Sequence, residues 1–219
     1  MWREYFLDHF ESQTMKHPST QEIFTYWNTL REARPAPLRS QINPVAIPKV
    51  LPDIFLLDCI EDDQHLIRLA GTRLCTLFGK ELRGQSFNSL WNEFGEHHID
   101  DLLRTVVDEH AAVVAGAEGY SSSEHLCRLE LILLPLRTND GSPTRVIGCL
   151  SPSTLPLWFS VQHVASVHLT TVRYYWPTGR RDAGNTHFES GEADSLVQAR
   201  RIGRFMVYEG GAAKTAELV

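Results

Sequence analysis

The sequence lacks the patterns that mark zinc sites, membrane spans and secretion. Its four cysteines, at positions 59, 75, 127 and 149, include no CxxC pair, so the ligand spacing of a zinc site is absent. No apolar run approaches the roughly 20 residues that a spanning helix needs. The start Met-Trp-Arg-Glu-Tyr-Phe does not have the layout of a signal peptide. We therefore expect a cytoplasmic protein without a membrane span.

Positive charge is also scarce. Lys and Arg total 21 against 27 Asp and Glu, which gives a net charge of -6. A general nucleic-acid binder needs a basic face that displaces counterions from phosphates. The arginines of the last 40 residues or so are spread too widely to form one compact patch. We expect no nucleic-acid partner.

Motifs of catalysis and metal binding are missing as well. The chain has no GxSxG, HExxH, GxGxxG or Walker pattern. The acidic run Glu61-Asp62-Asp63 lacks the glycine and the alternation of a calcium loop, so it is expected to be a solvated turn. The sequence therefore predicts neither an enzyme nor a metal site.

The first strong pattern is an amphipathic helix near the N-terminus. Ser19 and Glu22 have the spacing of a capping box, and the helix should end before Pro35. Apolar residues recur behind the cap at i, i+3, i+4 and i+7, and they are Ile23, Tyr26, Trp27 and Leu30. Large aromatics are favoured anchors of interfaces, so we predict that this stripe binds a second copy or a partner. Burial against the chain's own sheet is the open alternative.

The order of the later elements indicates the fold class. Five prolines between positions 35 and 52 predict an extended connection. Two strands in a hairpin follow, then short helices and a longer one over about 99–112, and then three strands. Such an order favours an α+β fold with a five-stranded antiparallel sheet and helices on one face.

The same pass divides the chain into three parts. Residues 1–53 hold the N-terminal helix and a proline-rich lead-in, and residues 54–156 hold the sheet and its helices. Residues 157–219 form a C-terminal extension that turns rich in Gly, Arg, Asp, Ser and Thr, a composition typical of partial disorder.

Several segments, in this order and spacing, resemble a known family. They include Tyr26-Trp27, Leu51-Pro52-Asp53-Ile54-Phe55, Arg68-Leu69-Ala70-Gly71-Thr72, Phe78-Gly79 and Gly148. Over roughly residues 21–155 the chain is similar to the stand-alone bacterial PAS domains called PAS_5, which are common in alphaproteobacteria. The resemblance implies a PAS fold and a cytoplasmic single-PAS regulatory protein without its own catalytic output domain. Such a protein would act in signal transduction by contacts with a kinase or regulator, as a homodimer through its N-terminal helix.

The resemblance also implies a place for a ligand. PAS domains typically hold a small molecule between the sheet and the helices, and an apolar lining there suits either a pocket or a packed core. The candidate lining residues are Phe78, Phe87, Trp91, Leu103, Val107, Leu131 and Leu133. A sensor of a small hydrophobic ligand is therefore the alternative function. Some PAS domains bind haem through a helix histidine, and His110 is the weak candidate for this role.

One charged residue interrupts the second strand of the hairpin. Arg68 stands among apolar residues, and Asp58 lies on the facing strand. Opposite charges on facing strands attract, so the two are expected to pair. The alternative is that Arg68 is a polar handle inside a pocket.

Overall fold

The computed structural model describes residues 15–59, 65–138, 144–176, 199–202 and 205–209. The helices are α2 (Pro18–Arg31), α3 (Thr72–Phe78) and α4 (Glu93–Asp108). Short 3-10 helices are η1 (Arg39–Gln41), η2 (Pro44–Ala46), η3 (Leu51–Asp53), η4 (Asn88–Leu90) and η5 (Leu157–Ser160). The strands are β1 (Ile54–Cys59), β2 (His65–Ala70), β3 (Ala112–Ser121), β4 (Leu126–Leu136), β5 (Thr144–Pro152), β6 (Val164–Tyr175), β7 (Ala199–Ile202) and β8 (Phe205–Glu209).

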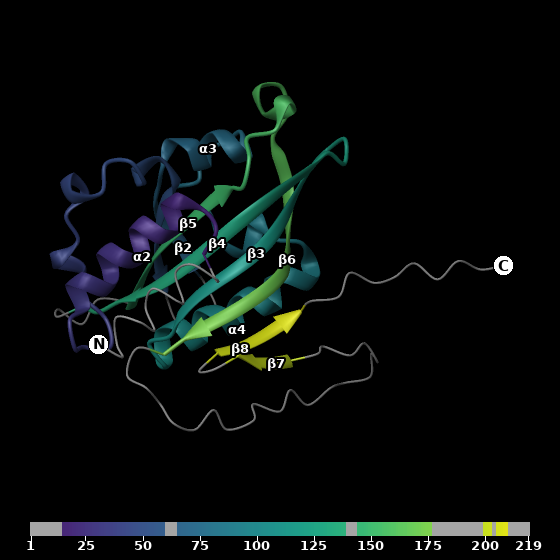
Figure 1. The fold of residues 1–219 in the computed structure, drawn as a ribbon. Helices are drawn as coiled ribbons and strands as arrows, with labels where there is room; N and C mark the ends of the chain where they lie inside the picture. The colour runs from purple at the N-terminus through teal and green to yellow at the C-terminus, as the bar shows by residue number, and fades with distance from the viewer. Residues whose placement is uncertain (1–14, 60–64, 139–143, 177–198, 203–204, 210–219) are drawn as a thin grey trace.

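All the strands belong to one antiparallel sheet in the order β2-β1-β5-β4-β3-β6-β8-β7 (Figure 1). The five predicted strands are present, and they occupy one side of this order. The predicted count of five is nevertheless too low, because the sheet has eight described strands. The largest addition is β6, which pairs with β3 from Ala112↔Tyr175 to Ser121↔Val164.

The α+β class is confirmed, but the prediction of helices on one face is too simple, because α2 packs on the face opposite to α3 and α4. Strand β4 shows the division, because successive side chains of a strand point to opposite faces. Leu131 and Leu133 join the core under α3 and α4, whereas Ile132 and Leu134 join a second core under α2. The helix α2 lies across the strands in Figure 1. The sheet is thus packed between two layers.

The start of α2 differs from the predicted capping box. His17 is the N-cap, and its side chain accepts a hydrogen bond from the Ser19 backbone N–H at 3.2 Å. Pro18 follows in the first turn, where a missing N–H costs nothing. The Ser19 hydroxyl is therefore free to bond elsewhere, and it donates to Asp53 at 2.8 Å.

The longest helix also ends earlier than predicted. α4 ends at Asp108, and His110 has a φ of 55°, a left-handed conformation that stops a helix. Strand β3 begins soon afterwards. None of the helices in the described ranges combines the length and the apolar character that a bilayer crossing requires.

The residues predicted to form a C-terminal extension contribute to the sheet. Strand β6 lies within 157–219, and β8 pairs with it at Thr171↔Glu209 to Arg173↔Val207. The composition that suggested disorder falls mainly on 177–198, which lies outside the described residues.

Candidate functional site

The seven predicted pocket residues all lie in the layer between the sheet and the helices α3 and α4. Six of them are buried, and Val107 packs against them from a partly exposed position. The rings contact one another closely, with centroids 4.9 Å apart for Phe55 and Phe87 and 5.8 Å apart for Phe87 and Trp91. The residues are thus brought together as predicted, and their side chains fill much of this layer. That they hold a ligand stays a prediction.

Two buried polar atoms in or beside this layer have no hydrogen-bond partner in the described part of the chain. The Nε1 of Trp91 and the Oδ1 of Asn88 are buried and have no hydrogen-bond partner among the described residues. A buried donor without a partner costs roughly 1–3 kcal/mol. Trp91 is therefore a polar as well as an apolar member of the layer.

A buried polar cluster that the sequence did not reveal lies beside this layer. His65 on β2 is 4% exposed, and its Nε2 lies 3.4 Å from the Oδ1 of Asp100 on α4. Asn88 donates a hydrogen bond to the same carboxylate oxygen at 2.5 Å. The cluster ties the edge strand β2 to η4 and α4. Because its members are 12 or more positions apart in the sequence, no local sequence pattern predicts the cluster.

The haem candidate His110 lies on the connection between α4 and β3, and it is half-buried. It is not part of the helix on which the sequence placed it. Within the described ranges, no group of three or more His, Cys, Asp or Glu side chains is arranged to hold a metal ion. Haem ligation by His110 stays a prediction. It assumed a histidine on the helix, and His110 lies two residues beyond the end of α4.

The predicted partners Arg68 and Asp58 do lie together. The Nε of Arg68 is 2.6 Å from Asp58 Oδ2, and Arg145 Nε is 3.0 Å from Asp58 Oδ1. The side chain of Arg68 is 60% exposed, so it is at the surface of the sheet and does not reach into a pocket. Arg145, which lies directly opposite Asp58 on β5, was not foreseen.

The predicted interface stripe on α2 is divided between the core and the surface. Ile23 and Trp27 have no exposed surface, and the indole N–H of Trp27 donates to the carbonyl of Pro135 at 2.8 Å. Burial against the chain's own sheet, the open alternative, therefore holds for these two residues, which cannot contact a second copy in this conformation. Tyr26 and Leu30 remain partly exposed.

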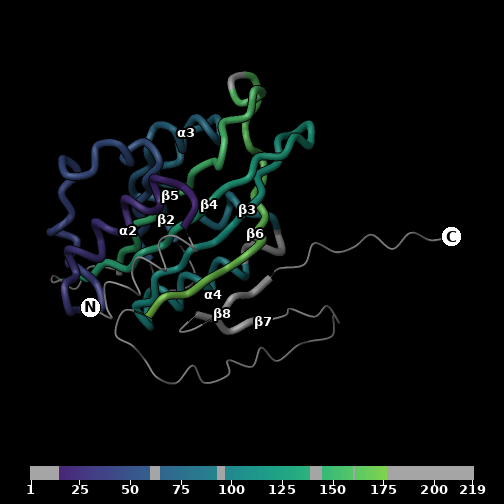
Figure 2. Tube along the Cα trace, in the orientation of Figure 1, coloured from purple at the N-terminus to yellow at the C-terminus, as the bar shows by residue number. Residues whose placement is uncertain are grey.

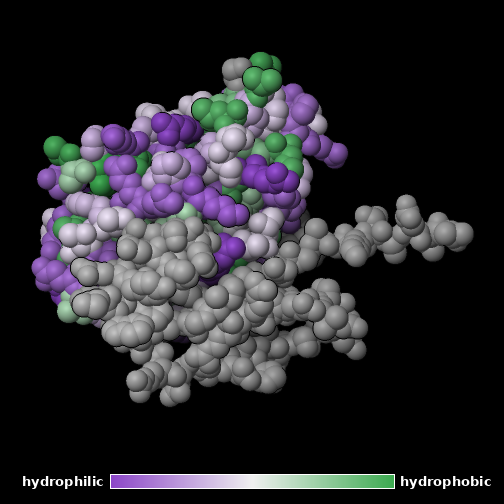
Figure 3. All heavy atoms as spheres, in the orientation of Figure 1, coloured by the Kyte–Doolittle hydropathy of each residue, from purple (hydrophilic) through white to green (hydrophobic). Residues whose placement is uncertain are grey.

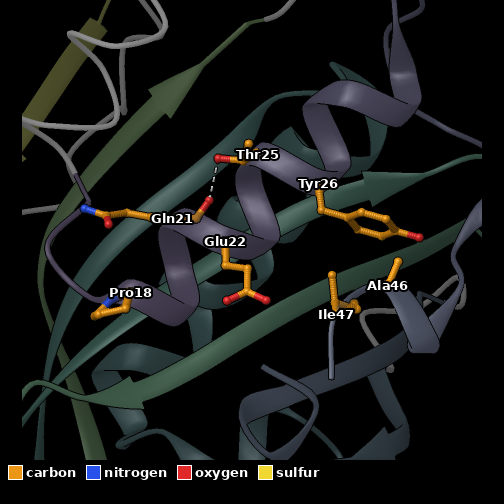
Figure 4. Close-up of a pocket in the computed structure, with 7 residues that line it drawn as sticks. All are labelled: Pro18, Gln21, Glu22, Thr25, Tyr26, Ala46 and Ile47. Atoms are coloured by element: carbon orange, nitrogen blue, oxygen red, sulfur yellow. Dashed lines mark hydrogen bonds between the residues drawn. The ribbon is translucent and has the colours of Figure 1, made fainter. Parts of the chain in front are cut away.

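The outer face of α2 borders an open groove of about 530 Å³ (Figure 4). The groove runs between the helix and the segment around η2, and its lining is Pro18, Gln21, Glu22, Thr25, Tyr26, Ala46 and Ile47. The hydroxyl of Tyr26 accepts a hydrogen bond from the Asn43 backbone N–H at 2.7 Å, which fixes the far wall. Glu22 gives the groove a carboxylate.

Two buried carboxylates hold the N-terminal end of α2. Glu130 on β4 accepts hydrogen bonds from the backbone N–H groups of Lys16 and His17 at 2.8 and 2.9 Å. Asp53 accepts the Ser19 hydroxyl through Oδ2, and its Oδ1 has no hydrogen-bond partner in the described part of the chain. Negative charge at this end also suits the helix dipole.

Asp53 is also bonded to the opposite helix layer. The Nη1 of Arg73 on α3 lies 2.5 Å from the same Oδ2 that accepts Ser19. One buried oxygen therefore joins a helix on one face of the sheet to a helix on the other. Asp53 appeared in the sequence only as part of the family resemblance, without a role.

The thiols near these sites are held in their neutral form. Burial raises the pKa of Cys149 from 9.0 to about 12, and its Sγ lies 3.2 Å from the Ser151 hydroxyl. Burial, assisted by the charge of Asp58, likewise raises the pKa of Cys59 to about 12. A thiol in this state is a poor nucleophile at neutral pH.

Solved structures that resemble the chain include a variant of RsLOV, at 14% identity and a TM-score of 0.38, with 48% of this chain and 61% of that one covered. A variant of the fungal photoreceptor VVD matches at 18% identity and a TM-score of 0.40, with 64% and 99% covered. The PAS domain of an HTR-like protein from Haloarcula marismortui matches at 21% identity and a TM-score of 0.35, with 46% and 81% covered.

The chain spans less than two thirds of the length of the RsLOV variant. None of the curated proteins matches the chain. The family model PAS_5, described as a PAS domain, matches residues 15–151, which is more than half of the chain. That stretch contains α2, the strands β1 to β4 and most of β5, and both buried carboxylates that hold α2. The chain therefore belongs to the PAS domain family of the PAS_5 type.

Proposed function

We propose that the chain is a cytoplasmic regulatory PAS protein that acts in signal transduction by binding another signalling protein, a kinase or a regulator, at the outer face of α2. It has no catalytic role of its own in this proposal. The observation that carries it is the bond of Asp53 to Ser19 and to Arg73 at once. A change in the layer that holds α3 thereby acts on the helix that docks the partner.

The bond is placed where movement would be transmitted. Asp53 is the last residue of η3 and immediately precedes β1. Its side chain is 1% exposed, whereas that of Arg73 is 41% exposed. A buried carboxylate depends strongly on its few partners because water cannot replace them. If α3 shifts and Arg73 withdraws, Asp53 is left with Ser19 alone, and the anchor of α2 changes.

The groove beside α2 supplies a docking surface at the helix that this bond controls. Its wall offers the exposed part of Tyr26 for apolar contact, and it offers the carboxylate of Glu22 as an acceptor for a hydrogen-bond donor of the partner. A partner segment with an apolar residue beside a Lys or Arg would complement both. A homodimer through Tyr26 and Leu30 uses the same face and is the second occupant that this surface admits.

A second function is favoured by one observation. The indole N–H of Trp91 is buried in the helix-sheet layer without a partner among the described residues. A small apolar ligand that carries one hydrogen-bond acceptor would satisfy this donor, and its arrival would displace packed side chains next to α4. The protein would then be a small-molecule sensor whose ligand sets its conformation. Native mass spectrometry of the purified chain tests this by the presence of an extra mass.

The leading proposal is tested by affinity capture from the native host with three baits. These are the wild-type chain, Glu22→Lys in the groove and Glu124→Lys at an exposed site in the β3–β4 turn, which matches the charge change. We expect a kinase or regulator to bind the wild type and Glu124→Lys and to be lost with Glu22→Lys. Equal recovery with all three baits would place the partner elsewhere and contradict the role of the groove.

A further inference from the structure

The loop between β5 and β6 carries three exposed large apolar side chains, among them the most exposed one in the described part of the chain. Leu157 is 100% exposed, Val161 is 80% exposed and Leu155 is 61% exposed. The loop contains η5 and projects from one end of the sheet, at the top of Figures 1 and 2. Figure 3 shows hydrophobic residues gathered at this end. We call residues 155–161 the apolar tip.

The tip and its approach carry no charged group. From Val146 to Gln162 the sequence has no Asp, Glu, Lys, Arg or His. Residues 146–152 of this stretch belong to the buried strand β5, where charge is not expected, but residues 153–162 at the surface lack charge too. Charged side chains normally form about a quarter or more of a protein surface. Exposed apolar patches on a soluble domain mark places that contact another apolar medium.

The backbone of the tip also suits an apolar medium. The N–H of Phe159 donates to Pro156 O at 3.1 Å, and those of Val161 and Gln162 donate to Trp158 O at 2.9 Å. Pro156 itself has no N–H to satisfy. Backbone groups that enter a lipid environment must be bonded internally, because no water is present there to pair with them.

The base of the tip is braced by the neighbouring hairpin. The ring of Trp158 stacks on His125 with centroids 6.0 Å apart, and Gln162 Oε1 lies 3.0 Å from His125 Nδ1. Trp158 is half-buried at the base of the tip, and tryptophan is a residue type enriched at membrane–water interfaces. The tip is therefore a braced projection with Leu157 and Val161 as its most exposed side chains.

We propose that the apolar tip inserts into the interfacial region of a lipid bilayer and gives the protein a reversible, peripheral membrane contact. This goes beyond the proposed role of α2 and does not depend on it. A protein partner is less well matched, because protein interfaces combine an apolar centre with a polar rim and about one hydrogen bond per 100–200 Å². The exposed side chains Leu155, Leu157 and Val161 are apolar, and the ionisable neighbour His125 lies at the base of the tip, so a bilayer interface can accept the outer side chains without pairing any charge.

The test uses the full chain and vesicles of phosphatidylcholine, which carry no net charge. The variant is Leu157→Ser combined with Val161→Ser, and the matched control is Val45→Ser, at an 83% exposed position on η2. We expect the wild type and the control to sediment with the vesicles, and the double variant to partition about tenfold or more weakly, since each side chain buries apolar area in the bilayer. Unchanged melting temperatures show that all three chains are folded.

Two results would overturn the proposal. The first is a wild-type chain that stays in the supernatant at millimolar lipid, and the second is a double variant that binds vesicles as well as the wild type. The first result has a positive alternative. If the wild type does not bind vesicles, and the double variant has a lower sedimentation coefficient than the wild type in the absence of lipid, the tip is a contact between copies of the chain. The single variant Leu155→Ser repeats the comparison at a third position if the double variant fails to fold.

Discussion

The guanidinium of Arg73 lies 2.5 Å from Asp53 Oδ2, so a partly exposed residue of α3 is paired with a carboxylate that is fully buried. The Ser19 hydroxyl of α2 binds the same oxygen from the other face of the sheet. Asp53 thus depends on both helix layers. This relationship connects the packed layer in which PAS domains hold ligands to the helix for which we propose a docking role.

The stability of the chain should respond unequally to the loss of two of its ion pairs, Arg73–Asp53 and Arg68–Asp58. Arg73→Gln leaves the buried Asp53 with one donor, so we expect the free energy of unfolding to fall by about 2 kcal/mol. Arg68→Gln is the matched control, because Asp58 keeps Arg145 at 3.0 Å, and a loss below about 1 kcal/mol is expected. Urea unfolding measures both. A larger loss of unfolding free energy for Arg68→Gln than for Arg73→Gln would contradict the claim that Asp53 depends more strongly on its arginine than Asp58 does.

Trp27 should behave as a core residue. It is fully buried and bonded to Pro135 O, so Trp27→Ala should lower the free energy of unfolding by about 3–5 kcal/mol. Tyr26→Ala, on the groove side of the same helix, should cost clearly less. Equilibrium denaturation of the two variants checks this. Equal costs would mean that α2 is not seated on the sheet through Trp27.

Two glycines should differ in their tolerance of a methyl group. A Cβ at Gly71 would collide with the backbone oxygens of Leu51 and Pro52, which cannot move aside easily. Gly71→Ala should therefore destabilise by about 3 kcal/mol. Gly84 has open space around it but a φ of 82°, so Gly84→Ala should cost only about 1 kcal/mol of backbone strain. Thermal unfolding of both variants measures these losses of stability. A larger loss for Gly84→Ala than for Gly71→Ala would contradict the prediction.

Stability should fall at high pH because of the buried thiols. The pKa of Cys149 is about 12 in the folded chain against 9.0 in the unfolded one, so its contribution is complete below pH 9 and declines as the pH rises towards 12. Between pH 9 and pH 10 the unfolded state gains thiolate and the folded state does not. We expect this single thiol to remove roughly 1 kcal/mol by pH 10.

The variant Cys149→Ala isolates that contribution, since lysines and tyrosines titrate in the same range. Urea unfolding at pH 8 and pH 10 should show a smaller loss of stability for Cys149→Ala than for the wild type. An identical loss in the two chains would show that Cys149 ionises in the folded state as readily as in the unfolded one.

The sequence predicted the parts of the fold that follow from local patterns. The hairpin of β1 and β2, the order of the elements and the stripe on α2 all came from periodicity and turn signals. Strand β6 was missed because its side chains from Ser166 onward, except Val167, are half-buried on both faces, so neither alternation nor a fully apolar run marks it. Half-burial of that kind arises from neighbours distant in sequence.

The candidate site was foreseen only in part, for the same reason. The apolar layer around Phe87 and Trp91 follows from composition and the family resemblance. The role of Asp53 depends on Ser19 and Arg73, which are 34 and 20 positions away. Ser19 was assigned to a cap because its spacing to Glu22 suited one, but His17 took that role and left the hydroxyl for Asp53. Competition between local and distant partners is settled by the packed fold.

Hydrogen-deuterium exchange of α2 tests the central claim most directly. It compares the wild type, Arg73→Gln and the control Arg68→Gln, with Arg73 and Arg68 both outside α2. If Asp53 couples α3 to α2, amides in the first turns of α2 will exchange faster in Arg73→Gln and remain as in the wild type in Arg68→Gln. Identical exchange of α2 in all three chains would contradict the coupling.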